Sequence, residues 1–316
     1  MEIRKVGVVG AGTMGSSIAE VFAFNGYDVK LKDQNTDLAR KGLENVKKIV
    51  SGYEKMIRER PEKEIAKIES YGISLDQSQK DSIRKTLGQD FKASNVIDRI
   101  SLTDDYSEMG ECDYIVEAVF ENEKVKGDVF SNLSKNGRED AVIASNTSSL
   151  SITKLSSSFN HPERVLINHF FNPPYLLPLI EVVPSLMTDE AIAEQNIKFL
   201  SSLKNHRESM VPVMVREREG FIVNRILIPM INDAGRMLDE NVSTIAEIDK
   251  AMKKGAGMPM GPFELADMIG LDVVKDVMDV LRESYGDHYI TSQTIKRMVE
   301  AKKLGKKSKI GFYSYK

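Results

Sequence analysis

A G-x-G-x-x-G segment formed by Gly10, Gly12 and Gly15 constrains the fold more than any other part of this chain. It follows a short apolar strand at residues 6–9 and opens a helical pattern that runs to about residue 25. A second apolar strand, residues 28–33, then ends in an acid, Asp33. Three glycines alone indicate only a tight turn. Between a strand and a helix, and followed by an acid about twenty residues later, they predict a dinucleotide-binding unit.

Each glycine has a physical task in such a unit. Gly10 permits the tight turn, and Gly12 lets the backbone approach a pyrophosphate. Gly15 lets the helix pack closely on the strand. Thr13 and Met14 begin the helix, whose N-terminal N–H groups and positive dipole end attract phosphate. All five residues are therefore expected to contact the cofactor.

The acid at the end of the second strand indicates which dinucleotide is bound. Asp33 is expected to accept hydrogen bonds from the adenosine ribose hydroxyls. Its carboxylate would repel a 2′-phosphate, which favours NAD over NADP. Lys32 lies next to it in the sequence and would weaken this preference.

Short apolar strands alternate with helical patterns through the first two thirds of the chain. Strands are expected at residues 100–102, 113–119, 141–145, 165–168, 179–183 and 211–215. Such alternation predicts an α/β fold with a Rossmann-type, doubly wound and mostly parallel sheet. Residues 218–316 show five helical patterns and no convincing strand. We therefore expect a Rossmann domain at residues 1–217 and an all-helical domain at residues 218–316, which either dimerises and closes the substrate cleft or only stabilises the protein.

A highly charged region at about residues 35–97 separates the second strand from the third. Apolar residues recur at helical intervals in both of its halves. Pro61 and Gly72 are expected to interrupt these helices and to leave a long helical hairpin inserted in the first domain. Its charge runs most simply form a hydrated face, and a partner surface is the alternative.

Composition excludes several classes of function. The chain has 44 Lys and Arg against 47 Asp and Glu, a net charge of −3, which argues against a general nucleic-acid binder. The single cysteine, Cys112, cannot form an intramolecular disulfide, and the pattern of Cys and His suggests no metal site. Neither a signal peptide nor an apolar run of membrane-spanning length is recognisable, so a cytoplasmic location without membrane contact is expected.

Polar residues follow three of the predicted strands, at residues 118–121, 146–148 and 169–172. Ligands of doubly wound sheets bind beyond the C-terminal strand ends, so these segments are expected to converge.

His169 ends one apolar run, and Glu181 lies inside the next one. A histidine held by a carboxylate can take a proton near neutral pH. A histidine hydrogen-bonded at a strand end for structural reasons is the alternative.

Further segments join the glycine turn in a more specific pattern. They are residues 117–122 with Lys126, 145–150, 169–173 with Glu181, 220–225, 255–265 and 311–315. With them the chain resembles the 3-hydroxyacyl-CoA dehydrogenase family almost from end to end. The resemblance implies NAD-dependent oxidation of (S)-3-hydroxyacyl-CoA to 3-oxoacyl-CoA and the reverse reaction, in the β-oxidation of fatty acids. It also implies a homodimer formed through the helical domain.

The resemblance further implies catalytic roles. His169 is expected to be the general base that takes the proton of the 3-hydroxyl group. Glu181 would orient its ring and stabilise the imidazolium, as a carboxylate does in serine-hydrolase triads. Ser148 and Asn172 would hydrogen-bond the substrate oxygen or the surroundings of the histidine, unless they only cap a helix or build a turn. Asn224 would approach the site from the helical domain, or be a buried structural residue at the domain joint.

The remaining implied residues concern the cofactor. Glu121 and Lys126 are expected near the nicotinamide ribose. Ala118, Asn146 and Ser148 are expected to complete the cofactor site at the strand ends. No metal is needed, because the dinucleotide carries the hydride chemistry.

Two departures from the family concern the substrate. The charged hairpin is about twenty residues longer than the resemblance leads us to expect, and it lies where it could touch CoA. Residues 174–178 are similar to those of related hydroxy-acid dehydrogenases of the gulonate type, which act without CoA. Residues 255–265 resemble the acyl-CoA enzymes far more closely, so a CoA thioester is the preferred substrate. The third hypothesis is a non-catalytic member of the fold that only binds a nucleotide or has a structural role. The presence of His169, Glu181, Ser148 and the glycine turn argues against it.

Overall fold

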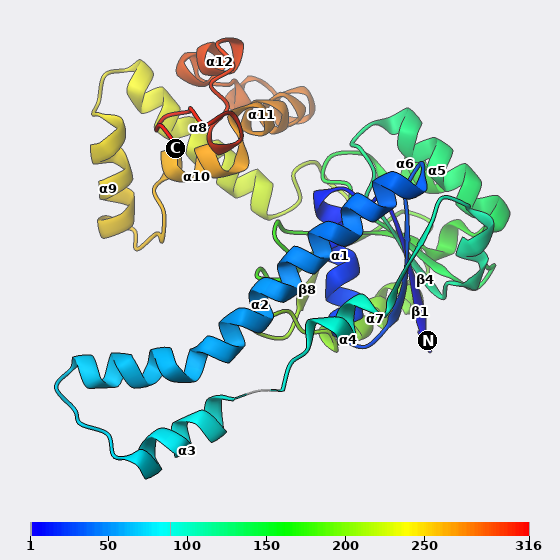
Figure 1. The fold of residues 1–316 in the computed structure, drawn as a ribbon. Coiled ribbons are helices and arrows are strands. Elements are labelled where there is room, and N and C mark those ends of the chain that lie inside the picture. The colour runs from blue at the N-terminus through cyan, green and yellow to red at the C-terminus, as the bar shows by residue number, and fades with distance from the viewer. Residues whose placement is uncertain (1, 89, 316) are drawn as a thin grey trace. The chain divides into compact units, whose positions relative to one another are not determined.

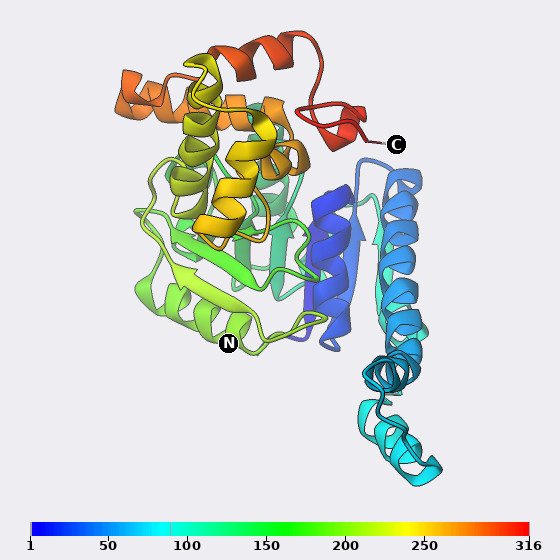
Figure 2. The same ribbon diagram turned by 90° about the vertical axis from the view of Figure 1, so that its left-hand side faces the viewer.

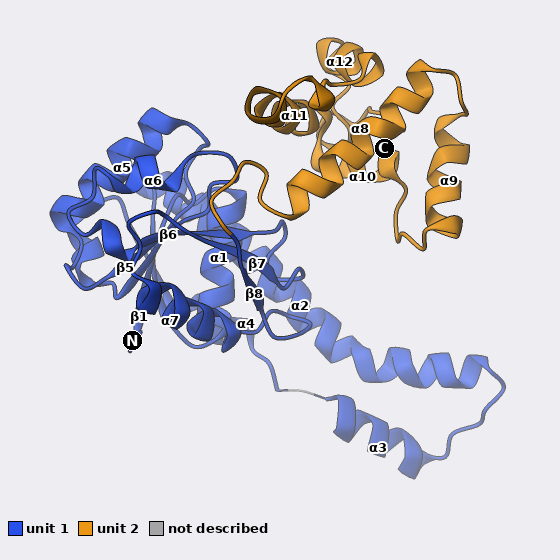
Figure 3. Ribbon diagram, turned by 180° about the vertical axis from the view of Figure 1, so that it is seen from behind, with its two compact units in different colours: residues 1–215 blue, residues 216–316 orange. Residues whose placement is uncertain are grey.

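The structure, a computed structural model, describes residues 2–88 and 90–315. It divides into two compact units, one ending at Val215 and the other beginning at Arg216 (Figure 3). The division falls at the start of the charged stretch 216–219. Dimerisation and closure of the substrate cleft, the tasks expected of the second unit, stay predictions. No helix within the described residues is long and apolar enough to cross a membrane.

An eight-stranded sheet forms the centre of the first unit. Its strands are β1 (Lys5–Val9), β2 (Asp28–Lys32), β3 (Ile100–Thr103), β4 (Tyr114–Glu117), β5 (Val142–Ser145), β6 (Val165–Phe170), β7 (Leu179–Pro184) and β8 (Val211–Met214). Their order is β3-β2-β1-β4-β5-β6-β7-β8, and only β6 and β7 run antiparallel. The predicted doubly wound and mostly parallel sheet is confirmed. Strands buried on both faces read as continuous apolar runs, which is why they could be recognised.

The first unit also contains seven α-helices within its described residues. They are α1 (Thr13–Phe24), α2 (Thr36–Ser70), α3 (Gln77–Leu87), α4 (Ala93–Ile97), α5 (Glu123–Asn136), α6 (Ile152–Ser156) and α7 (Glu190–Ser201). α3 packs on α2, away from the sheet (Figure 1). α1 and the first part of α2 lie side by side (Figure 2). Ile18 and Phe22 of α1 pack with Val8 of β1 and Val46 of α2 in one fully buried apolar cluster. This packing fixes the helix that follows the glycine turn.

The first helix of the charged insertion, α2, is longer than the sequence suggested. We expected Pro61 to interrupt the helical pattern, and that prediction was wrong, because α2 continues past it to Ser70. Ile57, Pro61 and Ile65 are all buried at intervals of four residues, so one apolar stripe passes through the proline. A proline inside a helix removes one backbone hydrogen bond and bends the axis, and the ribbon of α2 bends along its length (Figure 1). Gly72, with φ +80°, follows the end of α2.

The second unit is all-helical in its described residues, which confirms the predicted fold class. Its helices are α8 (Val223–Asp239), α9 (Ile245–Gly255), α10 (Pro262–Ile269), α11 (Leu271–Tyr285) and α12 (Gln293–Glu300). Ile228 and Ile231 of α8 pack with Val274 and Met278 of α11 and with Ile295 of α12. These residues form the core of this unit.

Two buried aspartates accept hydrogen bonds from residues of segments 255–265 and 311–315. The Asp249 carboxylate accepts hydrogen bonds from the Phe263 backbone N–H (2.8 Å) and from the Tyr313 hydroxyl (2.7 Å). The Asp267 carboxylate accepts bonds from the Tyr313 N–H (2.8 Å) and from the Tyr315 hydroxyl (2.9 Å). Both segments therefore hold the second unit together.

Candidate active site

The glycine turn has the geometry that a dinucleotide requires. Gly10 has φ +100°, and a Cβ added there would lie 2.7 Å from the Ala118 carbonyl oxygen. A Cβ at Gly15 would lie 1.7 Å from the Gly10 carbonyl oxygen. The chain itself therefore demands glycine at both positions. Gly12 differs, because no heavy atom of the described residues, its two chain neighbours aside, lies within 4 Å of the Cβ position there. Its missing side chain keeps space open for a ligand.

A cavity of about 880 Å³ lies beside this turn. Gly10, Gly12, Thr13, Met14, Asp33 and Ala118 line it together with residues of β2, of the loop after β3 and of α5. Two backbone N–H groups, from Ala11 and Gln34, each donate a 2.7 Å hydrogen bond to Asp33 and fix its carboxylate at the cavity. The open approach at Gly12, the N-terminus of α1 and this fixed carboxylate fit the pyrophosphate and adenosine ribose of NAD.

A methyl group at Gly12 should weaken cofactor binding without weakening the fold. The φ of −66° and ψ of −167° there are open to any residue, so Gly12→Ala should keep or slightly raise the free energy of unfolding. We expect its NADH affinity to fall about tenfold or more, because the methyl group fills the phosphate approach. Fluorescence titration with NADH and thermal melting measure the two effects.

Gly15→Ala is the matched control for that variant. Its methyl group would collide with the Gly10 carbonyl inside the protein, so it should lose stability before any ligand is added. A Gly12→Ala protein that binds NADH as tightly as the wild type would contradict the role given to Gly12.

Behind the cavity, Lys126 takes part in a buried ion-pair network. Its side chain is 1% exposed, and its ammonium donates to both oxygens of the Glu117 carboxylate, at 2.8 and 3.0 Å. It also lies 3.3 Å from the Glu121 carboxylate and bonds the Val119 carbonyl. The Glu117 carboxylate, itself fully buried, accepts a further hydrogen bond of 2.6 Å from the Ser145 hydroxyl. This network ties the C-terminal ends of β4 and β5 to α5.

Glu121 extends this network to the loop after β5. One of its oxygens accepts hydrogen bonds from the hydroxyls of Thr147 and Ser149 and from the N–H groups of Ser148 and Ser149. Burial alone would raise the pKa of the Glu121 carboxyl. The Lys126 ammonium and these hydrogen bonds outweigh burial, so the pKa lies below its ordinary value and the group stays charged. The contacts of Glu121 and Lys126 described here are with protein groups, and their expected place near the nicotinamide ribose stays a prediction.

His169 and Glu181 form a hydrogen-bonded pair. They face each other directly in the antiparallel ladder of β6 and β7, and His169 Nδ1 lies 2.8 Å from Glu181 Oε2. His169 is 8% exposed and Glu181 is 1% exposed. A carboxylate at Nδ1 assigns the ring proton to that nitrogen, so Nε2 carries the lone pair that can take a proton. The structure thus brings together the histidine and carboxylate that the sequence suggested.

The expected cofactor residue Asn146 and the other expected catalytic residues are placed as follows. Asn146 follows β5, and its side-chain oxygen accepts a 2.9 Å hydrogen bond from the Phe170 N–H, next to His169. Ser148 donates its backbone N–H to Glu121. Asn172 is exposed in the loop after β6, and Asn224 lies in the first turn of α8 in the second unit. Their catalytic roles stay predictions.

A second buried histidine–carboxylate pair was not anticipated. His206 Nε2 lies 2.7 Å from the Oε1 atom of Glu20 on α1, and Glu20 is fully buried. The Tyr53 ring stacks on the imidazole, with ring centroids 3.9 Å apart. Burial raises the pKa of the Glu20 carboxyl, although the His206 hydrogen bond opposes that effect. In the sequence, Glu20 lies between apolar residues of the same predicted helix. This position was the one sequence signal that the acid is buried.

Family models match nearly the whole chain. A model described as 3-hydroxyacyl-CoA dehydrogenase, NAD binding domain, matches residues 5–71 and 51–217. A second, described as 3-hydroxyacyl-CoA dehydrogenase, C-terminal domain, matches residues 220–315. The two sets of matched residues meet close to the division between the two units.

Individual relatives agree with these matches. The chain is 37% identical to a 3-hydroxybutyryl-CoA dehydrogenase of Clostridioides difficile, over 98% of this chain and 99% of that protein. It is 36% identical to the mitochondrial hydroxyacyl-coenzyme A dehydrogenase of Sus scrofa, over 99% of this chain and 92% of that protein. A crystal structure of (S)-3-hydroxybutyryl-CoA dehydrogenase from Ralstonia eutropha superposes with a TM-score of 0.81 at 32% identity, and each chain is fully covered.

Proposed function

The chain belongs to the 3-hydroxyacyl-CoA dehydrogenase family, and from this membership we propose that it interconverts (S)-3-hydroxyacyl-CoA and 3-oxoacyl-CoA with NAD. The observation that carries the proposal is the His169–Glu181 pair, on the same sheet as the glycine turn. β1, β4, β5 and β6 run parallel, so Gly10, Ala118, Asn146 and His169 all lie at one edge of that sheet. That edge is where ligands of such folds bind.

His169 carries the proton in this mechanism. In the oxidation direction its Nε2 accepts the proton of the substrate 3-hydroxyl group, and in the reduction direction the imidazolium returns it. Glu181, buried and bonded to Nδ1, holds the ring in the required tautomer and stabilises the imidazolium. NAD, when bound, supplies the hydride acceptor. Gly12, the first turn of α1 and Asp33 would hold it.

The surrounding residues would orient the reacting groups. Asn146 bonds the backbone next to His169 and thereby couples the end of β5 to the end of β6. We assign Ser148 and Asn172 to hydrogen bonds with the substrate oxygen or with groups beside the histidine. Fixed donors of this kind stabilise an oxygen that gains negative charge, and placed in advance they need no reorganisation during the reaction. The catalytic role expected of Asn224, on α8, stays a prediction.

Consumption of NADH by the purified protein with acetoacetyl-CoA tests this function. We expect turnover with the CoA thioester and little with free sugar acids. Turnover of gulonate with NAD, and none with acetoacetyl-CoA, would instead favour the hydroxy-acid dehydrogenase suggested by residues 174–178. NADH binding without turnover of either substrate would favour a non-catalytic protein. A cytosolic location and a place in β-oxidation stay predictions.

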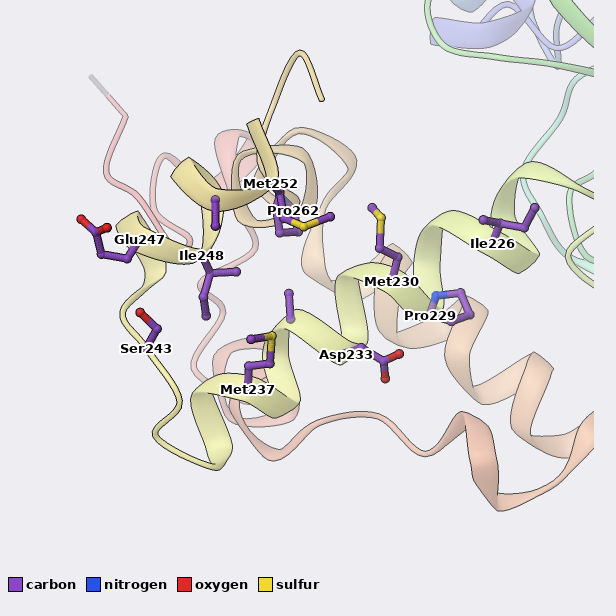
Figure 4. A pocket seen from close by; sticks show the side chains of 12 residues that line it. Ile226, Pro229, Met230, Asp233, Met237, Ser243, Glu247, Ile248, Met252 and Pro262 are labelled. Carbon is purple, nitrogen blue, oxygen red and sulfur yellow. The ribbon is translucent and has the colours of Figure 1, made fainter. Parts of the chain in front are cut away.

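We also propose a homodimer that forms through the helical unit. A groove of about 540 Å³ runs between α8 and α9, and apolar side chains line most of it (Figure 4). Met230 and Met237 of α8 and Ile248 and Met252 of α9 face this groove. Met237 is 38% exposed, and Ile226 at one end of the groove is 68% exposed. Exposed apolar patches of this kind are typical of protein interfaces.

Light scattering after size-exclusion chromatography tests the dimer. The wild type should elute at twice the 35.4 kDa of one chain. Met237→Glu should shift it to the monomer, because a buried carboxylate in an apolar interface is costly. Met268→Glu on α10 is the matched control, since Met268 is 49% exposed but does not line the groove. A monomeric wild type would refute the proposal.

A further inference from the structure

Strand β2 carries two buried lysines that differ in their partners. Lys30 and Lys32 are two residues apart and so point to the same face of the sheet, and they are 8% and 3% exposed. The Lys30 ammonium is paired with the carboxylates of Glu108 and Glu111. In the part of the chain that the structure describes, no carboxylate lies within ion-pair distance of the Lys32 ammonium. Its one hydrogen bond, of 3.2 Å, goes to the Asp33 carbonyl.

The Lys32 ammonium rests on an aromatic ring. Its Nζ lies 3.7 Å from the centroid of the Tyr106 ring, which is a cation–π geometry. Burial lowers the pKa of Lys32, and the nearby carboxylates of Asp33, Asp104 and Asp105 oppose that shift only in part. A buried ammonium without an ion-pair partner is costly for a fold. Among the described residues, the Tyr106 ring and the Asp33 carbonyl are therefore the groups in contact with this charge, and neither is a carboxylate.

Both residues line the cofactor cavity. Lys32 and Tyr106 share it with the glycine turn and with Asp33. Val125 and Val129 of α5 add apolar surface to the same cavity. If the turn holds the pyrophosphate and Asp33 the adenosine ribose, the base attached to that ribose must lie within reach of the neighbouring Lys32. Adenine offers ring nitrogens that accept hydrogen bonds, and an ammonium offers donors.

We infer that Lys32, steadied by the Tyr106 ring, is the residue that recognises the adenine base of NAD, by donating a hydrogen bond to a ring nitrogen. This inference rests on the proposed function, because it assumes that the cavity takes NAD. An alternative role for the ammonium is to bind the 2′-phosphate of NADP. The charges of three nearby carboxylates, those of Asp33, Asp104 and Asp105, act on the ammonium and make the region unfavourable for a second phosphate.

Calorimetric titration with NADH, ADP-ribose and reduced nicotinamide mononucleotide tests the inference. ADP-ribose contains the adenylate half without nicotinamide, and the mononucleotide contains nicotinamide without adenine. Lys32→Met should raise the Kd for NADH and for ADP-ribose about tenfold, the effect of losing one hydrogen bond to a charged group. Its affinity for the mononucleotide should match the wild type. Tyr106→Leu should raise the Kd for NADH and for ADP-ribose by a smaller factor and should also leave the affinity for the mononucleotide unchanged.

Lys30→Met is the matched control, since it removes a buried lysine from the same strand and face but outside the cavity. It should leave all three affinities unchanged. Equal ADP-ribose binding by Lys32→Met and the wild type would overturn the inference while leaving the proposed function intact. NADPH is titrated as a fourth ligand, and a Lys32→Met protein that loses affinity for NADPH alone would also overturn the inference, in favour of a phosphate contact. A wild type that binds neither NADH nor ADP-ribose would overturn both proposals.

Discussion

Replacing His169 by glutamine should lower kcat with acetoacetyl-CoA by about 10²- to 10⁴-fold, the usual share of a general acid–base group. Glutamine keeps a polar side chain of similar reach but cannot carry a proton between substrate and solvent. The Kd for NADH should stay within about twofold, because the glycine turn and Asp33 would hold the cofactor. Stopped-flow measurement of NADH oxidation and fluorescence titration give the two quantities.

Measuring both reaction directions sharpens this test. The imidazole accepts a proton in the oxidation direction, and the imidazolium donates one in the reduction direction. His169→Gln should therefore slow both directions. Glu181→Gln keeps an acceptor for the Nδ1 proton and should retain more activity than His169→Gln. Normal turnover in His169→Gln would exclude it as the base.

Removing the Lys126 ammonium should cost about 3–5 kcal/mol of unfolding free energy, because it leaves the fully buried Glu117 carboxylate without its cation. Lys126→Met tests this in urea denaturation. The control is Lys135→Met on the same helix, where an exposed lysine is replaced and the expected change is below about 0.5 kcal/mol. The double variant Glu117→Gln/Lys126→Met should recover part of the lost unfolding free energy. The neutral amide leaves no unpaired buried charge, and it can still accept the hydrogen bond of the Ser145 hydroxyl.

The same variant separates two roles for Lys126. A large loss of stability with little change in NADH affinity would make it a residue that positions the loops after β4 and β5. A Lys126→Met protein as stable as the wild type, but with weakened NADH binding, would instead support the cofactor contact that the family resemblance implies. That second result would contradict the stability prediction.

The order of strands and helices could be predicted because each is a short apolar run or an amphipathic repeat. The direction of β7 was not predicted, although its cause is visible in the sequence. Residues 171–178 between β6 and β7 are too few for the crossover that parallel neighbours require, so the two strands must be antiparallel. The prediction at Pro61 was wrong because the apolar stripe that continues through this residue outweighs the tendency of proline to end a helix.

The site could be predicted in part. Gly12 and Asp33 could be predicted from a local pattern. His169 and Glu181 could be predicted because a histidine at the end of one apolar run is followed by a carboxylate inside the next run. The surroundings of Lys126 could not be predicted. An amphipathic helix pattern places a lysine on the solvent side. It also does not show that the Glu117 carboxylate, at the end of β4, lies next to this lysine. The Glu20–His206 pair joins residues 186 positions apart in the sequence, so only the fold reveals it.

The pairing of β6 with β7 has a consequence for how enzymes of this kind acquire new substrates. His169 and Glu181 are held opposite each other by strand register, so their spacing does not depend on the loop at residues 171–178 that joins the strands. That loop can change in length and composition while the proton-transfer pair stays in place. The histidine–carboxylate pair is then fixed by the sheet, whereas the part of the loop after Asn172 can be exchanged. Grafting residues 174–178 from a relative with another substrate, with Asn172 kept, should redirect this protein's preference without rebuilding its catalytic pair.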